Sequence, residues 1–307
     1  MHSIPRVALA LALAAPGPLL AQGDDTAPFI LTIPASTRAH ALGNAGVALP
    51  DPEAAVFYNP AQLVTARGTS FSLTRYRGIS NHATLATTMA FLGGGVGVGA
   101  QRLEFFVPDT ELPGPRGGEG GLTLADDVLV TNTGATLGYA RTWSGFRLGL
   151  SARYVEQRAP DRRTSTTMVD IGMARSISGV TVGLAAQHLG PAIELGSETF
   201  DLPRRYTLGA AFQNQQIGTW FDLGASVAIP VYEDGSVLPG GGVELSYIPI
   251  EGVVITGRFG VRAVRRAAEF PTTAGAAVGF DNVLIEYAFQ SFDTPGYAHR
   301  VGVRLAP

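Results

Sequence analysis

The side chains that could support chemistry are scattered along this chain rather than grouped. Histidine is a common metal ligand and general base, but the five histidines show no ligand spacing: His2, His40, His82, His188 and His299. The chain has no cysteine, which excludes thiolate metal sites and disulfide bonds. We therefore expect neither a metal ion nor a cofactor.

Nucleophilic catalysis and phosphate binding have equally little support. No nucleophile-elbow pattern surrounds the serines considered, which are Ser70, Ser72, Ser151 and Ser226. The glycine-rich run 93–99 is not followed by the helix that would meet a phosphate, because strand-like alternation continues through Val98 and Ala100. Three loop acids, Glu119, Asp126 and Asp127, are interpreted as solvated rather than as a cation site. We predict a non-enzymatic protein with no catalytic residues.

The first 21 residues have the pattern of an export signal. Arg6 precedes an apolar stretch over residues 7–20, and small Ala21 stands at the expected cleavage site. Two prolines interrupt this stretch, and it is shorter than the roughly 20 residues that a spanning helix needs. We expect the signal to be residues 1–21 and the mature chain to begin near Gln22.

The composition indicates a membrane protein built from strands. Hydrophobic residues make up 46% of the chain and charged residues only 15%, yet no apolar run after the signal approaches spanning length. The 39 glycines and frequent turn residues favour an all-β fold. The net charge of -3 gives no reason to expect a nucleic-acid partner.

From about Thr69 the hydrophobic pattern has a period of two, as in strands with one apolar face. Leu148 and Leu150, for example, alternate with Gly149 and Ser151. The pattern predicts fourteen strands, at 69–77, 82–92, 95–106, 127–142, 145–157, 165–176, 179–188, 204–214, 218–229, 239–249, 252–262, 272–280, 283–291 and 298–305. Several match the roughly 9 to 11 residues of a tilted transmembrane strand.

Short and long connections between these strands alternate. The short ones are expected at 93–94, 143–144, 177–178, 214–217, 249–251 and 281–282. The long ones are expected at 107–126, 158–164, 189–203, 230–238, 263–271 and 292–297, and only the first connection, 78–81, is short where a long one is predicted. Short turns on one side are typical of an outer-membrane barrel, so we predict a closed, up-and-down antiparallel β-barrel over residues 67–307 with its apolar face toward outer-membrane lipid.

Two charged pairs are expected on the inward face. Glu244 lies roughly opposite Arg258 across one turn, and Glu286 roughly opposite Arg304 across the last hairpin. Cross-strand ion pairs commonly stabilise sheets, which we favour over ligand contact.

The inward positions also include several glycines: Gly149, Gly183, Gly209, Gly260 and Gly302. They leave room for water, a solute or the N-terminal segment. Asp51 and Asn59 can cap short helices that begin at Pro52 and Pro60. Small residues dominate 39–48, so this stretch suits a wall with little side-chain bulk. We predict that residues 22–66 form a plug, or hatch, inside the barrel, the alternative being a periplasmic extension.

Two segments of the sequence resemble a known superfamily. The run from Arg38 to Ala48, followed by Asp51, Ala54 and Asn59-Pro60-Ala61, resembles the N-terminal hatch of FadL-type outer-membrane barrels. The resemblance implies fourteen strands and a hatch motif of Gly43, Gly46, Asp51, Asn59, Pro60 and Ala61. The C-terminal phrase is more similar to the PorV/PorQ branch, through Glu286-Tyr287-Ala288-Phe289, Gly296 and His299-Arg300-Val301.

The resemblance implies two functions. A PorV/PorQ-type barrel handles secreted proteins at the cell surface as part of type IX secretion. A FadL-like barrel is a passive conduit that carries fatty acids or other hydrophobic small molecules past a hatch. The sparse outer loops and the C-terminal phrase favour the first, and the chain departs from both in lacking a terminal aromatic residue after Leu305.

Overall fold

The computed structural model describes residues 28–76, 80–108, 127–160, 162–195, 198–265, 269–292 and 296–306. The predicted signal, the start of the predicted hatch and two of the loop acids, Glu119 and Asp126, lie outside these residues. The helical elements are η1 (Phe29–Leu31), α1 (Thr37–Ala41), α2 (Pro52–Phe57) and η2 (Pro60–Val64). No helix among the described residues is long and apolar enough to cross a membrane.

Within the described residues, sixteen strands follow the helical segment. They are β1 (Gly68–Tyr76), β2 (Ser80–Phe91), β3 (Gly94–Pro108), β4 (Asp127–Trp143), β5 (Phe146–Ala159), β6 (Arg162–Ile177), β7 (Val180–Leu189), β8 (Ile193–Leu195), β9 (Glu198–Phe200), β10 (Arg205–Ile217), β11 (Phe221–Tyr232), β12 (Gly240–Ile250), β13 (Val253–Arg262), β14 (Glu269–Phe280), β15 (Val283–Phe292) and β16 (Gly296–Leu305).

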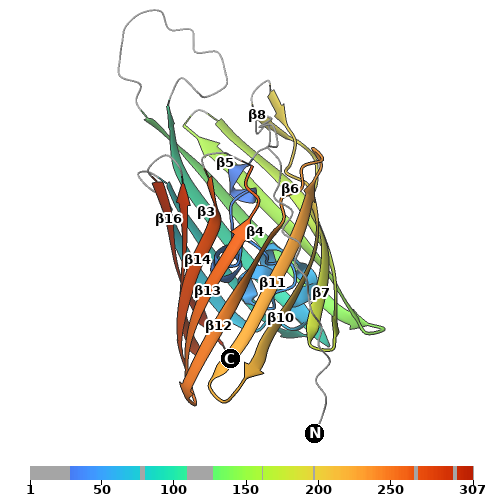
Figure 1. The fold of residues 1–307 in the computed structure, drawn as a ribbon. Coiled ribbons are helices and arrows are strands. Elements are labelled where there is room, and N and C mark those ends of the chain that lie inside the picture. The colour runs from blue at the N-terminus through green and yellow to red at the C-terminus, as the bar shows by residue number, and fades with distance from the viewer. Residues whose placement is uncertain are drawn as a thin grey trace, which may run out of the picture.

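Fourteen of these strands form one closed antiparallel barrel, which confirms the predicted fold class (Figure 1). Each strand pairs with its neighbour in the chain, except that β7 pairs with β10 because β8 and β9 form a separate hairpin. The first and last strands close the ring, with Thr69 opposite Leu305 and Tyr76 opposite Ala298. Closure leaves no open sheet edge in the ring.

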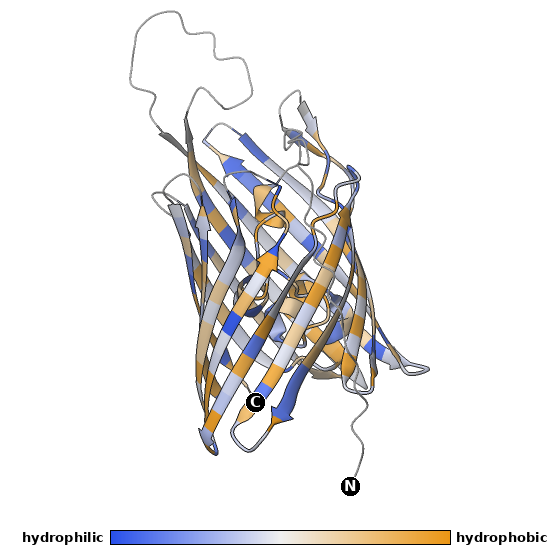
Figure 2. Ribbon diagram, in the orientation of Figure 1, coloured by the Kyte–Doolittle hydropathy of each residue, from blue (hydrophilic) through white to orange (hydrophobic). Residues whose placement is uncertain are grey.

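The alternation along each strand separates an apolar outer face from a mixed inner face. On β5, Leu148 and Leu150 point outward and are 40% and 56% exposed, whereas the next residue, Ser151, points inward and is 2% exposed. Figure 2 shows hydrophobic and hydrophilic positions alternating along the strands. The outer surface therefore has the character of a lipid-facing wall.

Tight turns lie at one end of the barrel. At three of them a residue with positive φ precedes a glycine with positive φ, as in the type I′ turns favoured by hairpins: Leu92-Gly93, Ser144-Gly145 and Ser178-Gly179. The other tight turns are 218–220, 251–252 and 281–282. The predicted turn at 214–217 is wrong, because β10 continues to Ile217 through a register shift between Phe212 and Gln215.

Two connections at the other end also differ from expectation. A long loop was expected at 158–164, but β5 and β6 extend until Ala159 lies opposite Arg162. The stretch 189–203, expected to be an irregular loop, contains the β8–β9 hairpin, in which Ile193 lies opposite Phe200. Turn-type residues such as Pro160 mark a break in the chain but do not set the length of the flanking strands.

The N-terminal segment, residues 28–66, lies within the ring of strands (Figure 1). A Cβ atom on any of the five predicted inward glycines would meet an atom of this segment within van der Waals distance. The partners are Pro60 and Ala61 for Gly149, Val47 for both Gly183 and Gly209, Leu42 and Gly43 for Gly260, and Thr37 for Gly302. The missing side chains thus make the room that the segment occupies.

We expect Gly149→Val to destabilise the protein, because its side chain would overlap the backbone of Pro60 and Ala61. Overpacking of this kind costs about 1–3 kcal/mol, which a urea titration of the protein in lipid vesicles would measure. Gly257→Val is the matched control, since Gly257 has no neighbouring atom within 4 Å of an added Cβ. Equal stability of the two variants would contradict the close packing of segment and wall.

Candidate functional site

The cap of α1, the first α-helix of the N-terminal segment, joins two parts of the segment. The Ser36 hydroxyl oxygen accepts a hydrogen bond from the Ala39 amide at 3.2 Å and donates one to the Asp51 carboxylate at 3.1 Å. Asp51 in turn caps α2 by accepting from the Ala54 amide at 3.2 Å. One carboxylate therefore organises both α1 and α2.

The Asn-Pro-Ala motif fixes the next turn against the wall. The Asn59 side-chain oxygen caps η2 by accepting from the Ala61 amide at 3.0 Å, and its amide group donates to the Val47 carbonyl at 2.8 Å. Pro60 occupies the first position of η2, where a missing N–H costs nothing. Ala61 is fully buried beside Gly149 and Gly172, so a larger side chain has no space there.

The two motif glycines serve different contacts. Gly43 has a φ of 66° and lies against the carbonyl groups of Gly241 and Val261, a conformation and an approach that both favour glycine. A Cβ on Gly46 would lie 2.7 Å from the Tyr58 ring. The six hatch-motif positions therefore hold the segment's own turns and its contact with the barrel wall.

A chain of buried charges connects α1 to the wall. Arg38 of α1 forms an ion pair with Glu244 of β12, and Arg258 donates to Glu244 at 3.1 Å and to Glu286 at 2.8 Å. Arg304 completes the chain with Glu286 at 2.6 Å. The structure thus joins the four predicted lumen residues into one network and adds Arg38.

The register differs in one respect from expectation. Glu244 lies directly opposite Arg258, whereas Glu286 lies opposite Gly302 and reaches Arg304 diagonally. The small residue at Gly302 leaves the space through which Thr37 of α1 contacts the wall.

Arg300 of β16 is a second tie between wall and segment. It is fully buried and donates to the backbone carbonyl groups of Pro34 at 2.8 Å and Ala35 at 2.6 Å. Glu53 of α2 lies 3.9 Å from the same guanidinium and accepts from the Thr37 amide at 2.8 Å. The stretch 34–37 is therefore held by Arg300 of the barrel wall and by Glu53 of α2.

A third buried group lies on β5, β6 and β7. Arg153 pairs with Asp170 at 3.0 Å, and Asp170 accepts from the His188 amide at 2.7 Å. Gln187 donates to the Phe57 carbonyl of α2 at 2.8 Å. His188 has a φ of 62°, so β7 leaves its regular register at this residue. The Nδ1 atom of His188 forms a hydrogen bond with the Pro203 carbonyl at 2.9 Å.

Burial changes the protonation of two groups in the segment. Desolvation, with the nearby charges of Arg262 and Arg300, lowers the pKa of His40 to about 3, so this histidine is neutral near pH 7. Desolvation raises the pKa of Glu53, against the opposing effects of Arg300 and Ser72. His40 therefore serves as a neutral hydrogen-bond partner of Gln290, at 3.0 Å, rather than as a charge.

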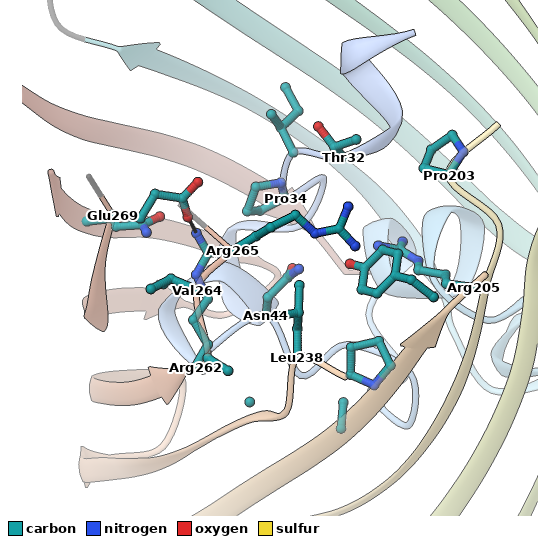
Figure 3. A pocket seen from close by; sticks show the side chains of 18 of the residues that line it. Thr32, Pro34, Asn44, Pro203, Arg205, Leu238, Arg262, Val264, Arg265 and Glu269 are labelled. Atoms are coloured by element: carbon teal, nitrogen blue, oxygen red, sulfur yellow. Dashed lines mark hydrogen bonds and ion pairs between the residues drawn. The ribbon is translucent and has the colours of Figure 1, made fainter. Parts of the chain in front are cut away.

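A cavity of about 290 Å³ lies between the N-terminal segment and the outer ends of the strands. Its lining includes Pro34 and Asn44 of the N-terminal segment, together with Leu238 and Val264 of the connections that follow β11 and β13 (Figure 3). Other apolar lining residues are Phe29, Ile33, Leu103, Ala228, Pro230 and Phe292.

Each charged residue that lines the cavity has a polar partner. Arg262 pairs with Glu269 at 2.6 Å, and Arg265 pairs with Asp234 at 3.0 Å. Arg205 donates from Nε to the Gln187 side chain at 2.8 Å. The cavity thus has a mixed lining in which apolar surface exceeds polar surface.

Sequence reasoning missed the residues that tie the segment to the wall and those that line the cavity. Arg38, Arg300 and Arg205 are all nine-tenths or more buried. For Arg300 and Arg205 a signal existed, since each occupies the inward phase of its strand, where an unpaired charge is expensive. Nothing in the sequence marked Leu238 or Val264.

The remaining residues considered for chemistry are dispersed. Two of the serine hydroxyls bond acids: Ser72 donates to Glu53 at 2.6 Å and also accepts from Arg300 at 2.7 Å, and Ser151 donates to Asp170 at 3.5 Å. Among the described residues no group of three or more histidine or acidic side chains could hold a metal ion.

Solved structures show the same fold in known outer-membrane channels. The toluene transporter TodX of P. putida is 10% identical, with a TM-score of 0.59, covering 89% of this chain and 98% of its own. The toluene transporter TbuX of Ralstonia pickettii is 13% identical, with a TM-score of 0.52 and coverages of 88% and 98%. A FadL homologue of Pseudomonas aeruginosa is 11% identical, with a TM-score of 0.51 and coverages of 89% and 98%.

No protein-family model matches this chain, and neither does any curated protein. The structural neighbours are FadL-family outer-membrane channels, and at these identities they establish the fold alone. A closed barrel of fourteen strands with such neighbours places the protein in the outer membrane. The PorV/PorQ branch is not confirmed.

We expect Arg38→Met to destabilise the protein strongly, because it breaks a buried ion pair and leaves Glu244 with one partner fewer. Breaking such a pair costs about 3–5 kcal/mol. Arg102→Met is the control, because Arg102 pairs with Glu104 on the outer face with its side chain 61% exposed, and exposed pairs contribute about 0–1 kcal/mol. Denaturant unfolding in lipid vesicles would compare them, and similar losses would contradict an energetic role for the buried network.

Proposed function

We propose that this protein is a non-enzymatic, passive channel for hydrophobic small molecules across the outer membrane. The observation that carries the proposal is the cavity of about 290 Å³ held inside the barrel, above the N-terminal segment and open toward the strand ends that bear the longer connections. A conduit needs such a space between the outside and its plug.

The size and lining of the cavity favour a small apolar ligand. A cavity of about 150 Å³ is enough for benzene, so the observed space holds a monoaromatic molecule with room to spare. The apolar lining suits such a ligand, since binding sites bury most of a small ligand against hydrophobic side chains. TodX and TbuX, which share the fold, are toluene transporters.

In this proposal, residues 22–66 are the hatch and residues 67–307 the barrel. The described part of the segment fills the inner half of the barrel and is held by Arg38 and Arg300. A ligand that reaches the cavity can pass further only if part of the segment shifts or if the ligand finds a route beside it. The hatch is thus the barrier to free diffusion.

The channel hypothesis is preferred over the PorV/PorQ-type role in handling secreted proteins. The neighbours that support an argument from fold are channels, and the cavity suits a small molecule rather than a polypeptide. We therefore retain hydrophobic small molecules, together with the surrounding lipid, as the proposed partners.

Deletion of residues 22–66 is expected to open the barrel to small polar solutes. The inward glycines that now contact the segment would line an unfilled lumen. Single-channel conductance in planar bilayers would rise severalfold over that of the full chain. A deletion variant that keeps heat-modifiable gel mobility and yet conducts no more than the parent would refute the hatch.

Filling the cavity should slow uptake. Leu238→Trp adds bulk to a lining residue, whereas Val237→Trp changes its neighbour, which is 39% exposed and does not line the cavity. We expect cells that express the Leu238 variant to take up radiolabelled toluene at low concentration several times more slowly than the parent. The Val237 variant should match the parent, and equal uptake by all three proteins would remove the cavity from the route.

A further inference from the structure

The outer face of the barrel carries an open groove near the tight-turn end. It runs over β4, β5 and β6, and its outward-facing lining consists of Tyr139, Arg141, Trp143, Leu148, Leu150 and Ile171. Five of these six side chains are apolar or aromatic and between 38% and 71% exposed. The groove lies on the wall that faces lipid and has no part in the internal cavity.

Arg141 is the exception in this groove. It points outward between Gly94 of β3 and Leu148 of β5, and no hydrogen bond or ion pair joins it to any residue in the described part of the chain. A guanidinium with no partner in the described part of the chain is available to an anionic group of the surrounding membrane.

A second outward arginine lies two strands away on the same wall. Arg175 of β6 places its guanidinium 4.8 Å from the centre of the Phe146 ring, and none of the described acidic side chains pairs with it. The stretches 89–103, 134–155 and 171–193 contain no aspartate or glutamate at all. The tight-turn ends of β3 to β7 therefore present positive charge, although the whole chain has a net charge of -3.

The position of the groove along the barrel axis identifies the membrane leaflet that it contacts. Tight turns of outer-membrane barrels lie on the periplasmic side, and Trp143, which is 71% exposed, directly precedes the Ser144-Gly145 turn. Exposed tryptophan at this position marks the headgroup level of the bilayer. The groove thus meets the inner leaflet, where basic side chains attract anionic headgroups.

We propose that this groove binds an anionic glycerophospholipid of the inner leaflet. Arg141 holds the headgroup phosphate between Tyr139 and Trp143, Arg175 adds positive charge beside the groove, and an acyl chain lies along Leu148, Leu150 and Ile171. Charge complementarity favours an anionic over a zwitterionic lipid. The site is independent of the proposed channel, because none of its outward residues reaches the internal cavity.

The chain has two tryptophans, so the site can be tested by fluorescence. In a Trp220→Phe variant, Trp143 is the sole reporter. The protein is reconstituted into phosphatidylcholine bilayers that contain acyl-brominated phosphatidylglycerol or acyl-brominated phosphatidylcholine, and quenching gives the relative affinity at Trp143. We expect a preference of about fivefold for phosphatidylglycerol, reduced in high salt by screening.

Two variants separate the site from a general surface effect. Arg141→Gln combined with Arg175→Gln should abolish the preference, whereas Arg102→Gln, an outward arginine that already pairs with Glu104, should leave it unchanged. In the reciprocal Trp143→Phe protein, Trp220 reports on the β10–β11 turn, where Asp222 follows, and should show no preference. Heat-modifiable gel mobility verifies that each variant is folded.

Equal quenching of Trp143 by the two brominated lipids would overturn the proposal. So would a preference that survives loss of both arginines, or an equal preference at Trp220. Toluene uptake is measured separately, and its failure would leave the lipid site standing.

Discussion

Backbone N–H and C=O groups cannot remain unpaired in hydrocarbon, and every other feature of this protein depends on that constraint. The strands meet it by closing into a ring, in which the pairing of β1 with β16 removes the last open edge. Closure then divides every strand into an outer apolar face and an inner face shielded from lipid. The inner face is free to carry charge, glycine and hydroxyl groups, provided that each finds a partner inside.

Much of that partnership comes from the N-terminal segment. Arg300 takes two of its acceptors, the carbonyl groups of Pro34 and Ala35, from the segment, and the wall hydroxyls of Ser72, Thr74 and Thr84 supply others. Glu244 likewise takes one of its two arginines from α1. Because a buried ion pair is costly to break, specific polar contacts hold the segment in addition to its buried hydrophobic area. The barrel wall and the segment each supply hydrogen-bonding partners for the other's buried polar groups.

The distribution of small residues decides where the interior is full and where it is empty. Inward glycines line the half of the barrel that contains α1, α2 and η2, and the segment fills this half tightly. Toward the longer connections the inward positions carry larger side chains, such as Arg205 and Tyr232, and the segment thins to η1. The cavity lies at this change, so the channel proposal and the packing of the hatch have one structural origin.

Residue patterns alone predict the closed barrel, the end that bears tight turns and the caps at Asp51 and Asn59, because period-two alternation, turn chemistry and capping can be recognised in short stretches of chain. They did not reveal that β10 runs on to Ile217, nor which inward charges meet. The contact of Arg38 with Glu244 joins residues 206 positions apart. Such contacts depend on strand register and ring closure, which bring distant segments together. The ion network, the cavity and the outer groove therefore become visible only in the folded protein.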